Sequence, residues 1–332
     1  MIPTFNDYVA LLYNRFEAFV QSSEASAKLG PYVYKQQEMI VFFMWMQFRT
    51  INEFKAQWRW LMQHEEALGV LGWSSVPHRT TLSRRFKKLY PVLQEFIAFL
   101  GQTSHALTPE MSTRHLNEDK SLFKAKGNVW HQSDRKQGHI PEKLRNLDTD
   151  ATWSKSGYHG WVYGYGLHLT STPAGFPVLL EVETATFSEK AAIAFKEETI
   201  LHQLKPETFC GDDAYTQARR IRQWAKQGVI LVAPALRWRN GRYAQAYRHF
   251  IKADVEIAAI LRRRKTAIEP IFDLIAKLLG TTGKQKQLFK QRLENVRTHL
   301  ALAVLSLQMA MIANAIWGIP FRTISHIKGA FA

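Results

Sequence analysis

The stretch VYGYGLHLTSTPAGFPVLLEVETATF, residues 162–187, decides the fold class of this 332-residue chain. Residues 162–172 and 176–187 are rich in β-branched, aromatic and aliphatic side chains, and a Pro-Ala-Gly sequence separates them. Two such runs joined by a short turn predict a β-hairpin. Short apolar runs and helical segments then alternate, at 188–204, 208–210, 216–227 and 229–234. A hairpin followed by strands that alternate with helices predicts an α/β fold with a mixed sheet.

Residues 1–103 have a different pattern, with helical periodicity, no strand-like alternation and few glycines or prolines. Helices are expected there at 5–19, 36–64, 65–71 and 79–90, with a break in the second near 50–52. Beyond the sheet, a basic loop and two long helices are expected, the helices at 254–279 and 289–317. We therefore divide the chain into an all-α N-terminal region at 1–103 and an α/β core at 104–332, in line with the length of the chain.

The chain is strongly basic: 44 Lys and Arg outnumber 28 Asp and Glu, which gives a formal net charge of +16. Most of the excess lies in residues 215–300, which contain 19 Lys and Arg and 5 Asp and Glu. Solvated helix faces normally carry both signs of charge. A one-sided excess is typical of a surface that contacts phosphates, so a nucleic-acid partner is expected.

The single cysteine, Cys210, excludes an intramolecular disulfide framework and a cysteine-ligated zinc ribbon, and it fits a reducing compartment. The N-terminus has neither the basic segment nor the uninterrupted apolar core of a signal peptide. Residues 39–48 are too few to span a membrane. Residues 300–317 are just long enough but include Gln308 and Asn314, so we expect a buried C-terminal helix and no membrane partner.

Three acidic residues stand at positions suited to metal binding. Asp119 lies where a first strand is expected, Asp212 ends a short apolar strand, and Glu269 lies on a long helix. Carboxylates from two strand ends and a facing helix can hold two divalent cations about 3.5–4 Å apart, which supports in-line phosphoryl displacement. Plainer interpretations are a strand-end surface acid for Asp119 and a turn former or N-cap for Asp212. Glu269 would then pair with Lys265, and spacing alone favours these interpretations.

A longer sequence resemblance favours the metal-binding interpretation over the plainer ones. The stretch KAKGNVWHQSDRKQGHIPEKLRNLDTDATWSKSGYHGWVYGYGLHL, residues 124–169, and the contexts of the three acids resemble the DDE-type transposases of bacterial insertion sequences. In that family the second Asp occurs as Gly-Asp-x-x-Tyr, a context that falls on Asp212 with Tyr215. The Glu occurs as Ile-Glu-Pro-x-Phe, which falls on Glu269, and the first Asp falls on Asp119. The resemblance runs from about Asp119 to the C-terminus.

The resemblance implies an RNase H-like core that cleaves and joins DNA, with Asp119, Asp212 and Glu269 as catalytic and metal-binding residues. Two Mg²⁺ ions are the implied cofactor, with Mn²⁺ as a substitute, and Asp119 bridges them. One ion generates hydroxide and later activates a 3′-OH, while the other stabilises the leaving oxygen. The implied partners are double-stranded DNA, as element terminal inverted repeats and as target, and a second copy of the chain. The implied location is the cytoplasm, at the bacterial nucleoid.

The chain departs from the family pattern beside the acids. Lys120 stands where the family has a small residue after the first Asp. Strand alternation allows Lys120 to point away from the site, and otherwise it would compete with metal. Asp213 adjoins Asp212, so the sequence leaves open which of these two acids binds metal. The positions that hold Tyr, Arg and Lys around the Glu of the family are occupied by Arg262, Lys265 and Ala276.

Basic and aromatic residues of the core are the expected DNA contacts. The basic ones would hold the phosphate backbone and are Arg219, Arg220, Arg262, Arg263, Arg264 and Lys265. Tyr215, Trp130 and Trp153 are expected to support the site. Aromatic side chains stack on bases in proteins that bind single strands, and packing beside the sheet is an equal alternative for the two tryptophans.

The segment GWSSVPHRTTLSRRFKKLY, residues 72–90, is typical of a helix-turn-helix, in which the early residues of the second helix read bases in the major groove. The expected readers are His78, Arg79, Thr80 and Ser83. The expected phosphate contacts are Arg84, Arg85, Lys87 and Lys88. A basic surface of a helical bundle is the alternative interpretation of this segment.

Two other functions remain open. A catalytically decayed or domesticated DNA-binding protein derived from a transposase would keep the core as a scaffold, and Lys120 favours this function. A nuclease of RNase H-like fold without a joining step would use the same carboxylates.

Overall fold

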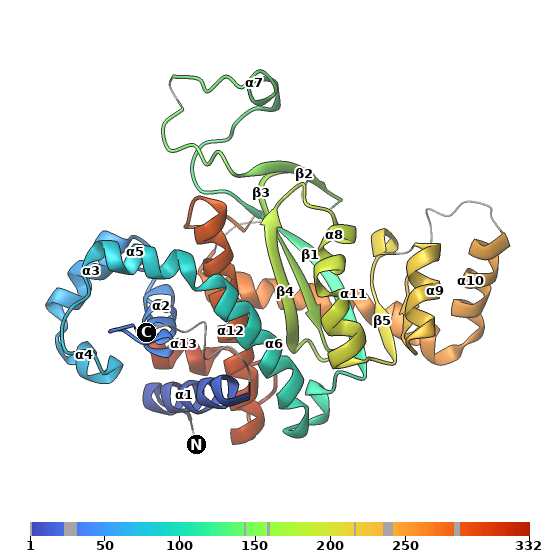
Figure 1. The fold of residues 1–332 in the computed structure, drawn as a ribbon, viewed down its shortest axis with the longest axis horizontal. Helices are drawn as coiled ribbons and strands as arrows, with labels where there is room; N and C mark the ends of the chain where they lie inside the picture. Colours follow the sequence, from blue (N-terminus) through green and yellow to red (C-terminus); the bar gives the residue numbers. More distant parts are fainter. Residues whose placement is uncertain are drawn as a thin grey trace.

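The computed structural model describes residues 2–22, 32–142, 144–157, 160–215, 217–234, 242–281 and 286–332, and for Lys265 it describes the backbone alone. A helical segment comes first, a strand-rich segment follows, and long helices come last (Figure 1).

A six-stranded mixed sheet forms the centre of the strand-rich segment. Its strands are β1 (His115–Lys124), β2 (Thr152–Ser156), β3 (Gly160–Ser171), β4 (Pro177–Thr184), β5 (Thr208–Cys210) and β6 (Ile230–Val232). The expected hairpin is confirmed, because β3 and β4 pair antiparallel across a turn in which Gly175 has a φ of 90°. β1 pairs antiparallel with β3 and parallel with β5, and β5 pairs parallel with β6. The predicted α/β class is therefore confirmed.

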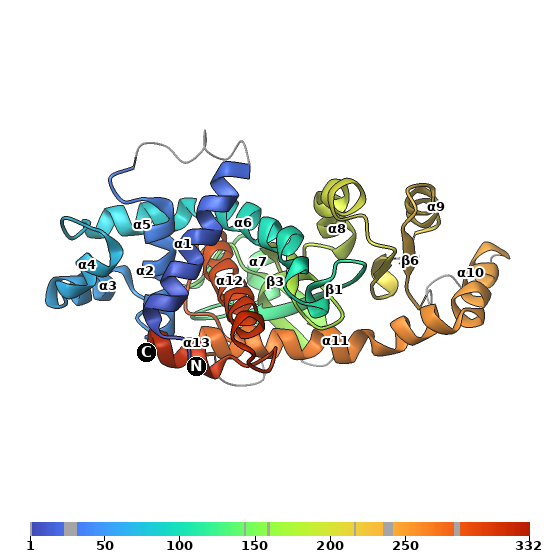
Figure 2. The same ribbon diagram turned by 90° about the horizontal axis from the view of Figure 1, so that it is seen from below.

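Helices cover both faces of this sheet. α11 (Val255–Leu279) runs along one face against β1, and α8 (Glu189–Glu198) lies on the opposite side (Figure 2). Because successive side chains of a strand point to opposite faces, β1 presents Asp119 toward α11 and Glu118 toward α8. The remaining helices of this part are α7 (Gln132–Lys136), α9 (Ala218–Lys226) and α10 (Arg242–Ala253).

The N-terminal helices pack around a helix from the other end of the chain. They are α1 (Phe5–Ser22), α2 (Gln36–Phe48), α3 (Phe54–Gln63), α4 (Glu66–Leu71), α5 (Arg79–Lys88) and α6 (Tyr90–Thr103). α12 (Leu293–Trp317) contacts α1, α2, α5 and α6 as well as β4, and α13 (Ser325–Phe331) follows it. One continuous apolar core therefore joins the two parts of the chain. The domain boundary at residue 103 stays a prediction.

Within the described ranges, α12 is the one helix long and apolar enough to cross a membrane, but 83% of its most apolar window is buried inside the protein. Gln308 uses its side-chain amide to donate hydrogen bonds to the carbonyls of Ile97 and Pro177, at 3.0 and 2.8 Å. The expectation of a buried C-terminal helix is confirmed.

Some helix boundaries match the sequence expectation, and others differ for local reasons. The expected break near 50–52 is confirmed, since Thr50 has a φ of 58° between α2 and α3. The helix expected at 188–204 is α8 followed by a π-helical segment, Thr199–Leu204. α12 starts later than expected because Arg292 has a φ of 70°, outside the helical region. α10 lies where the sequence predicts a basic loop.

Candidate active site

The structure brings Asp119 and Asp212 together where β1 meets β5. These strands are parallel neighbours with Asn117 opposite Cys210, and Asp119 and Asp212 each come two residues after this pair, Asp212 just beyond the end of β5. Gly211 allows the Tyr215 ring to approach the backbone closely, because a Cβ at this position would lie 2.6 Å from that ring. Asp212, in the turn after β5, is near enough to Asp119 for the two charges to interact.

α11 supplies a cation to this pair. Arg264 Nη1 lies 3.4 Å from Asp119 Oδ2, and the two side chains are 10% and 21% exposed. Burial raises the pKa of Asp119 to about 6, against the lowering effects of the Arg264 charge and of a hydrogen bond from the Lys120 backbone N–H. The charge of Asp212 raises the same pKa, which shows that the carboxylates interact.

Asp212 is held by its own turn. Its Oδ1 accepts a hydrogen bond of 2.7 Å from the backbone N–H of Ala214, in the 3-10 turn Asp213–Tyr215. This is the capping contact expected from the plainer interpretation, and it also fixes the direction of the carboxylate. Asp212, together with Glu118, is an acid whose charge raises the pKa of Asp119.

Tyr215 interacts with both acids, and its expected supporting role stays a prediction. Its ring is fully buried, and burial followed by the charges of Glu118 and Asp119 raises the pKa of its hydroxyl well above the ordinary value. Among the described residues the hydroxyl has no hydrogen-bond partner.

Glu269 does not join the pair. It lies on α11 five residues beyond Arg264 and is exposed to solvent. In the part of the chain that the structure describes, no group of three or more His, Cys, Asp or Glu side chains is close enough to hold a metal ion. The structure therefore brings two of the three expected carboxylates together and places the third outside.

The chemistry of the carboxylate pair fits a hard divalent cation. Mg²⁺ is usually bound through one or two carboxylates, with water and substrate phosphate completing its octahedron. Two buried polar atoms beside the pair, Tyr215 Oη and Arg264 Nη1, lack a hydrogen-bond partner within the described ranges. Comparisons of the chain with protein-family models, curated proteins and solved structures give no match.

Lys120 points to the face of β1 opposite Asp119. Its Nζ donates hydrogen bonds to the backbone carbonyls of Ala185 and Phe187, at 2.8 and 2.7 Å. Burial lowers the pKa of Lys120, against the raising effects of the Glu189 and Asp212 charges. Strand alternation thus places this lysine on the opposite face from Asp119, so it does not compete for a metal there.

A buried ionic network on that opposite face was missed by the sequence reasoning. Glu118 is fully buried, lies 2.5 Å from Lys196 Nζ of α8, and accepts a hydrogen bond from the hydroxyl of Thr170. Burial raises the pKa of Glu118 despite this pairing. His168 lies beside the network, and burial, followed by the charges of Lys196 and Lys120, lowers its pKa to about 2. Asn117 and Glu118, two polar residues in an expected strand, were the one sequence signal of this network.

The basic residues expected to contact DNA divide into exposed and buried ones. Arg219, Arg262 and Arg263 are exposed. Arg220 is buried and donates hydrogen bonds to the backbone carbonyls of Tyr215 and Lys190, while Arg264 faces Asp119. Neither buried arginine presents its charge to solvent, in contrast to the sequence expectation. The side chain of Lys265 lies outside the described part, so its contacts stay predictions.

The predicted helix-turn-helix segment, residues 72–90, contains the turn that follows α4 and the helix α5. α4 ends at Gly72, which has a left-handed φ of 70°, and α5 starts after His78. The His78 ring accepts a hydrogen bond from the backbone N–H of Thr80, so this residue caps α5. Arg79, Arg84 and Lys88 are exposed, whereas Lys87 pairs with Glu294 of α12 at 2.5 Å.

Arg85 differs from the other basic residues of α5. It is buried, donates a hydrogen bond of 2.8 Å to Gln36 Oε1, and its guanidinium lies 3.6 Å from the centre of the Tyr32 ring. These contacts replace the phosphate contact expected from the sequence, because the guanidinium is turned into the protein.

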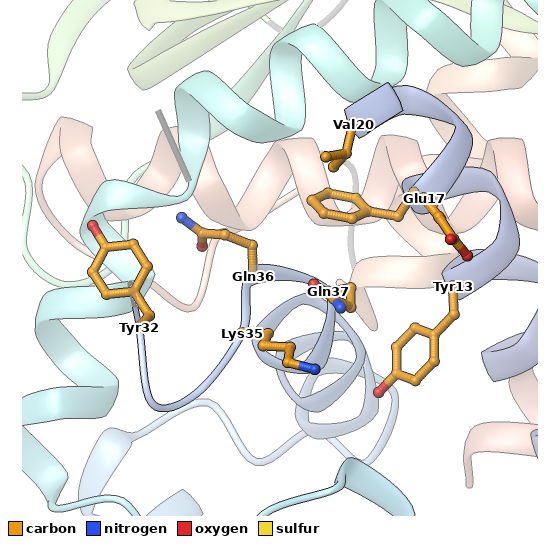
Figure 3. Close-up of a pocket in the computed structure, with 8 residues that line it drawn as sticks. Tyr13, Glu17, Val20, Tyr32, Lys35, Gln36 and Gln37 are labelled. Carbon is orange, nitrogen blue, oxygen red and sulfur yellow. The ribbon is translucent and has the colours of Figure 1, made fainter. Parts of the chain in front are cut away.

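A cavity of about 480 Å³ lies between α1 and the start of α2, beside these contacts of Arg85. Figure 3 shows the lining residues of α1, Tyr13, Glu17 and Val20, together with Tyr32, Lys35, Gln36 and Gln37. A second cavity, of about 500 Å³, opens beside β1 and α11 and is lined by Asn117 and Arg263 among others. The second cavity lies on the face of β1 that carries Asp119.

Trp130 and Trp153 make the contacts of packed side chains. Trp153 Nε1 donates a hydrogen bond of 2.7 Å to the backbone carbonyl of Trp130, and Trp130 Nε1 donates one of 2.9 Å to that of His139. The Trp153 ring centre lies 5.4 Å from that of Tyr163. The geometry favours the packing alternative, and base stacking stays a prediction.

Proposed function

We propose that the chain is a DDE-type DNA transposase with an RNase H-like core, which binds element ends and cleaves and joins DNA. The observation that carries this proposal is the interaction of Asp119 of β1 with Asp212, which follows the end of the neighbouring parallel strand β5, beside a buried arginine of α11. A mixed sheet with helices on both faces is compatible with such a core. The exposed arginines of α9 and α11 support a DNA partner.

Each residue of the pair has a role in this proposal. When bound, Mg²⁺ or Mn²⁺ supplies an activated oxygen nucleophile and stabilises the leaving oxygen. Asp119 and Asp212 hold the metal, and the burial of Asp119 strengthens its attraction for a cation because charges interact more strongly away from water. Tyr215, which follows Asp212 by three residues, supports the pair. Glu269 is the third carboxylate and has to turn from its exposed position toward the other two.

The proposed partner is double-stranded DNA, as element ends and as target. Two ends must be brought together for joining, so the proposed assembly is a homodimer on DNA, at the nucleoid in the bacterial cytoplasm. Arg262 and Arg263, exposed on α11, would contact the phosphate backbone.

The exposed position of Glu269 favours a second candidate function, that of a non-catalytic DNA-binding protein derived from a transposase. Lys120 no longer supports this candidate, because its side chain faces the opposite side of the sheet. A nuclease without a joining step would share the carboxylate pair and differ only in the fate of the cut ends.

A plasmid-cleavage assay tests the proposal. The purified chain should nick supercoiled DNA when Mg²⁺ or Mn²⁺ is added, and Asp119→Asn and Asp212→Asn should each lower the rate by at least about a hundredfold. Asp213→Asn is the matched control and should keep the wild-type rate. DNA binding without metal-dependent cleavage would favour the non-catalytic candidate, and cleavage without strand transfer would favour the nuclease.

A further inference from the structure

Arg264 is a buried cation whose hydrogen-bonding capacity is only partly used. Its Nη1 lies 3.4 Å from Asp119 Oδ2 and lacks a hydrogen-bond partner among the described residues. A charge-assisted hydrogen bond between arginine and carboxylate is normally about 2.7–2.9 Å long. The guanidinium is therefore held at the carboxylate by charge attraction, without a locked hydrogen-bond geometry.

The charges on this face favour more positive charge than Arg264 supplies. Asp119 and Asp212 interact with each other, and their like charges repel. The neighbouring residues of β1 also act on these acids. The charge of Glu118, which pairs with Lys196, raises the pKa of Asp119, and Lys120, which binds backbone carbonyls on the other face, interacts with the charge of Asp212. Arg264 thus supplies one positive charge to Asp119, which also experiences the like charges of Asp212 and Glu118.

We propose that Arg264 is a resident counter-ion that a divalent metal displaces. Arg264 balances the charge of Asp119 in the metal-free protein and leaves this carboxylate when Mg²⁺ or Mn²⁺ binds. The inference rests on the proposed function, because it takes Asp119 and Asp212 as metal ligands. Displacement follows from charge, since a guanidinium and a divalent ion at contact distance from the same carboxylate repel each other. Arg264 therefore lowers the affinity of the site for metal and keeps the acids compatible with folding in its absence.

Mn²⁺ binding to the full chain, measured by calorimetry without DNA, tests this inference. Arg264→Gln should bind Mn²⁺ at least about tenfold more tightly than the wild type, because an opposite charge at this range changes the proton affinity of a carboxylate by about 1–3 pKa units. Lys277→Gln removes an exposed positive charge further along the same helix and should leave the affinity unchanged. Asp119→Asn should abolish the binding.

The possible results separate the two proposals. Wild-type binding that depends on Asp119, with no gain of affinity in Arg264→Gln, would overturn the counter-ion role and leave the metal site intact. Absence of any Asp119-dependent binding in all variants would overturn the metal site and the inference together. Should Arg264→Gln fail to fold, a structure of the wild-type chain with Mn²⁺ decides. An Arg264–Asp119 separation beyond about 4 Å supports displacement, and a preserved contact refutes it.

Discussion

Glu118 and Asp119 are consecutive residues of β1, yet their carboxylates lie on opposite faces of the sheet and have different cationic partners. Lys196 contacts Glu118 at 2.5 Å, and Arg264 lies 3.4 Å from Asp119. Glu118 is fully buried, whereas the side chain of Asp119 is 21% exposed. One strand therefore carries an enclosed ion pair next to an accessible carboxylate, which distinguishes the structural acid from the candidate catalytic one.

Lys196→Met should strongly destabilise the fold, because it leaves Glu118 buried without its partner. Breaking a buried pair in this way costs about 3–5 kcal/mol. The free energy of unfolding, measured in urea at pH 7, should fall by this amount. Glu118→Gln combined with Lys196→Met should recover most of the loss, since it removes the uncompensated charge. Unchanged stability in the single variant would show that the pair makes no net contribution.

His299 should contribute to acid unfolding. Burial, followed by the charge of Lys290, lowers its pKa to about 3. In the unfolded chain its pKa is about 6.5, so below that pH the unfolded state binds a proton that the folded state excludes. The stabilisation is complete above pH 6.5 and is lost as the pH falls toward 3. Between pH 6.5 and 4, His299→Leu should therefore lose roughly 3 kcal/mol less unfolding free energy than the wild type. If urea titrations showed the unfolding free energies of His299→Leu and the wild type falling by the same amount over this pH range, the expectation would be contradicted.

Arg262 and Arg263 should account for part of the salt dependence of DNA binding. Each phosphate contact contributes close to one unit to the slope of log K against log salt. Replacing both arginines with alanine should reduce that slope by about two and weaken binding to all duplex sequences alike. Lys328→Ala, on α13, is the control and should leave the slope as it is. Fluorescence anisotropy at several salt concentrations measures the effect, and an unaltered slope in the double variant would place α11 away from DNA.

Arg79→Ala should reduce sequence discrimination without affecting non-specific cleavage. Arg79 is exposed at the start of α5, where a recognition helix contacts base edges. One good bidentate contact is worth about 1–3 kcal/mol of discrimination, so the preference for element ends over random DNA should fall correspondingly. Arg85→Ala should instead lower stability, because Arg85 is packed on Tyr32 and Gln36. Full end preference in Arg79→Ala would exclude the helix-turn-helix role.

Glu269→Gln separates the catalytic proposal from its non-catalytic alternative. If Glu269 turns into the site during the reaction, the substitution removes a metal-binding charge with little change in shape. Cleavage should then be abolished while binding to DNA is preserved. Plasmid nicking and anisotropy on the same preparations measure both properties. Cleavage at the wild-type rate would show that the exposed position of Glu269 persists throughout the reaction.

The fold class was predictable because its signals are local. The alternating residues of the hairpin and the turn between them lie within one short stretch, and the resulting β3–β4 pair is present. The pairing of β1 with β5 has no local signal: it joins His115 to Thr208 across 93 residues. The same is true of Lys196 and Glu118, which are 78 residues apart.

The position of Glu269 could have been anticipated from the helix that carries it. Ile268, Ile271 and Ile275 are fully buried and set the rotation of α11 about its axis. Glu269 follows the first of these residues and so projects away from that buried stripe. The motif context predicts that Glu269 is a catalytic acid, whereas the apolar stripe predicts that its side chain points away from the core. The two signals therefore disagree at Glu269.

The packing of α12 among the N-terminal helices has a consequence for synthesis of the chain on the ribosome. Residues 39–44 of α2, which are almost fully buried in the folded protein, emerge long before α12 is available to cover them. Such exposed apolar surface promotes aggregation and chaperone binding in incomplete chains. One contact of α5 also forms late in synthesis, namely the hydrogen bond that the Thr298 hydroxyl of α12 donates to the Phe86 carbonyl. The contacts that join the proposed DNA-reading helix to α12 thus form only after the carboxylate-bearing strands have been made.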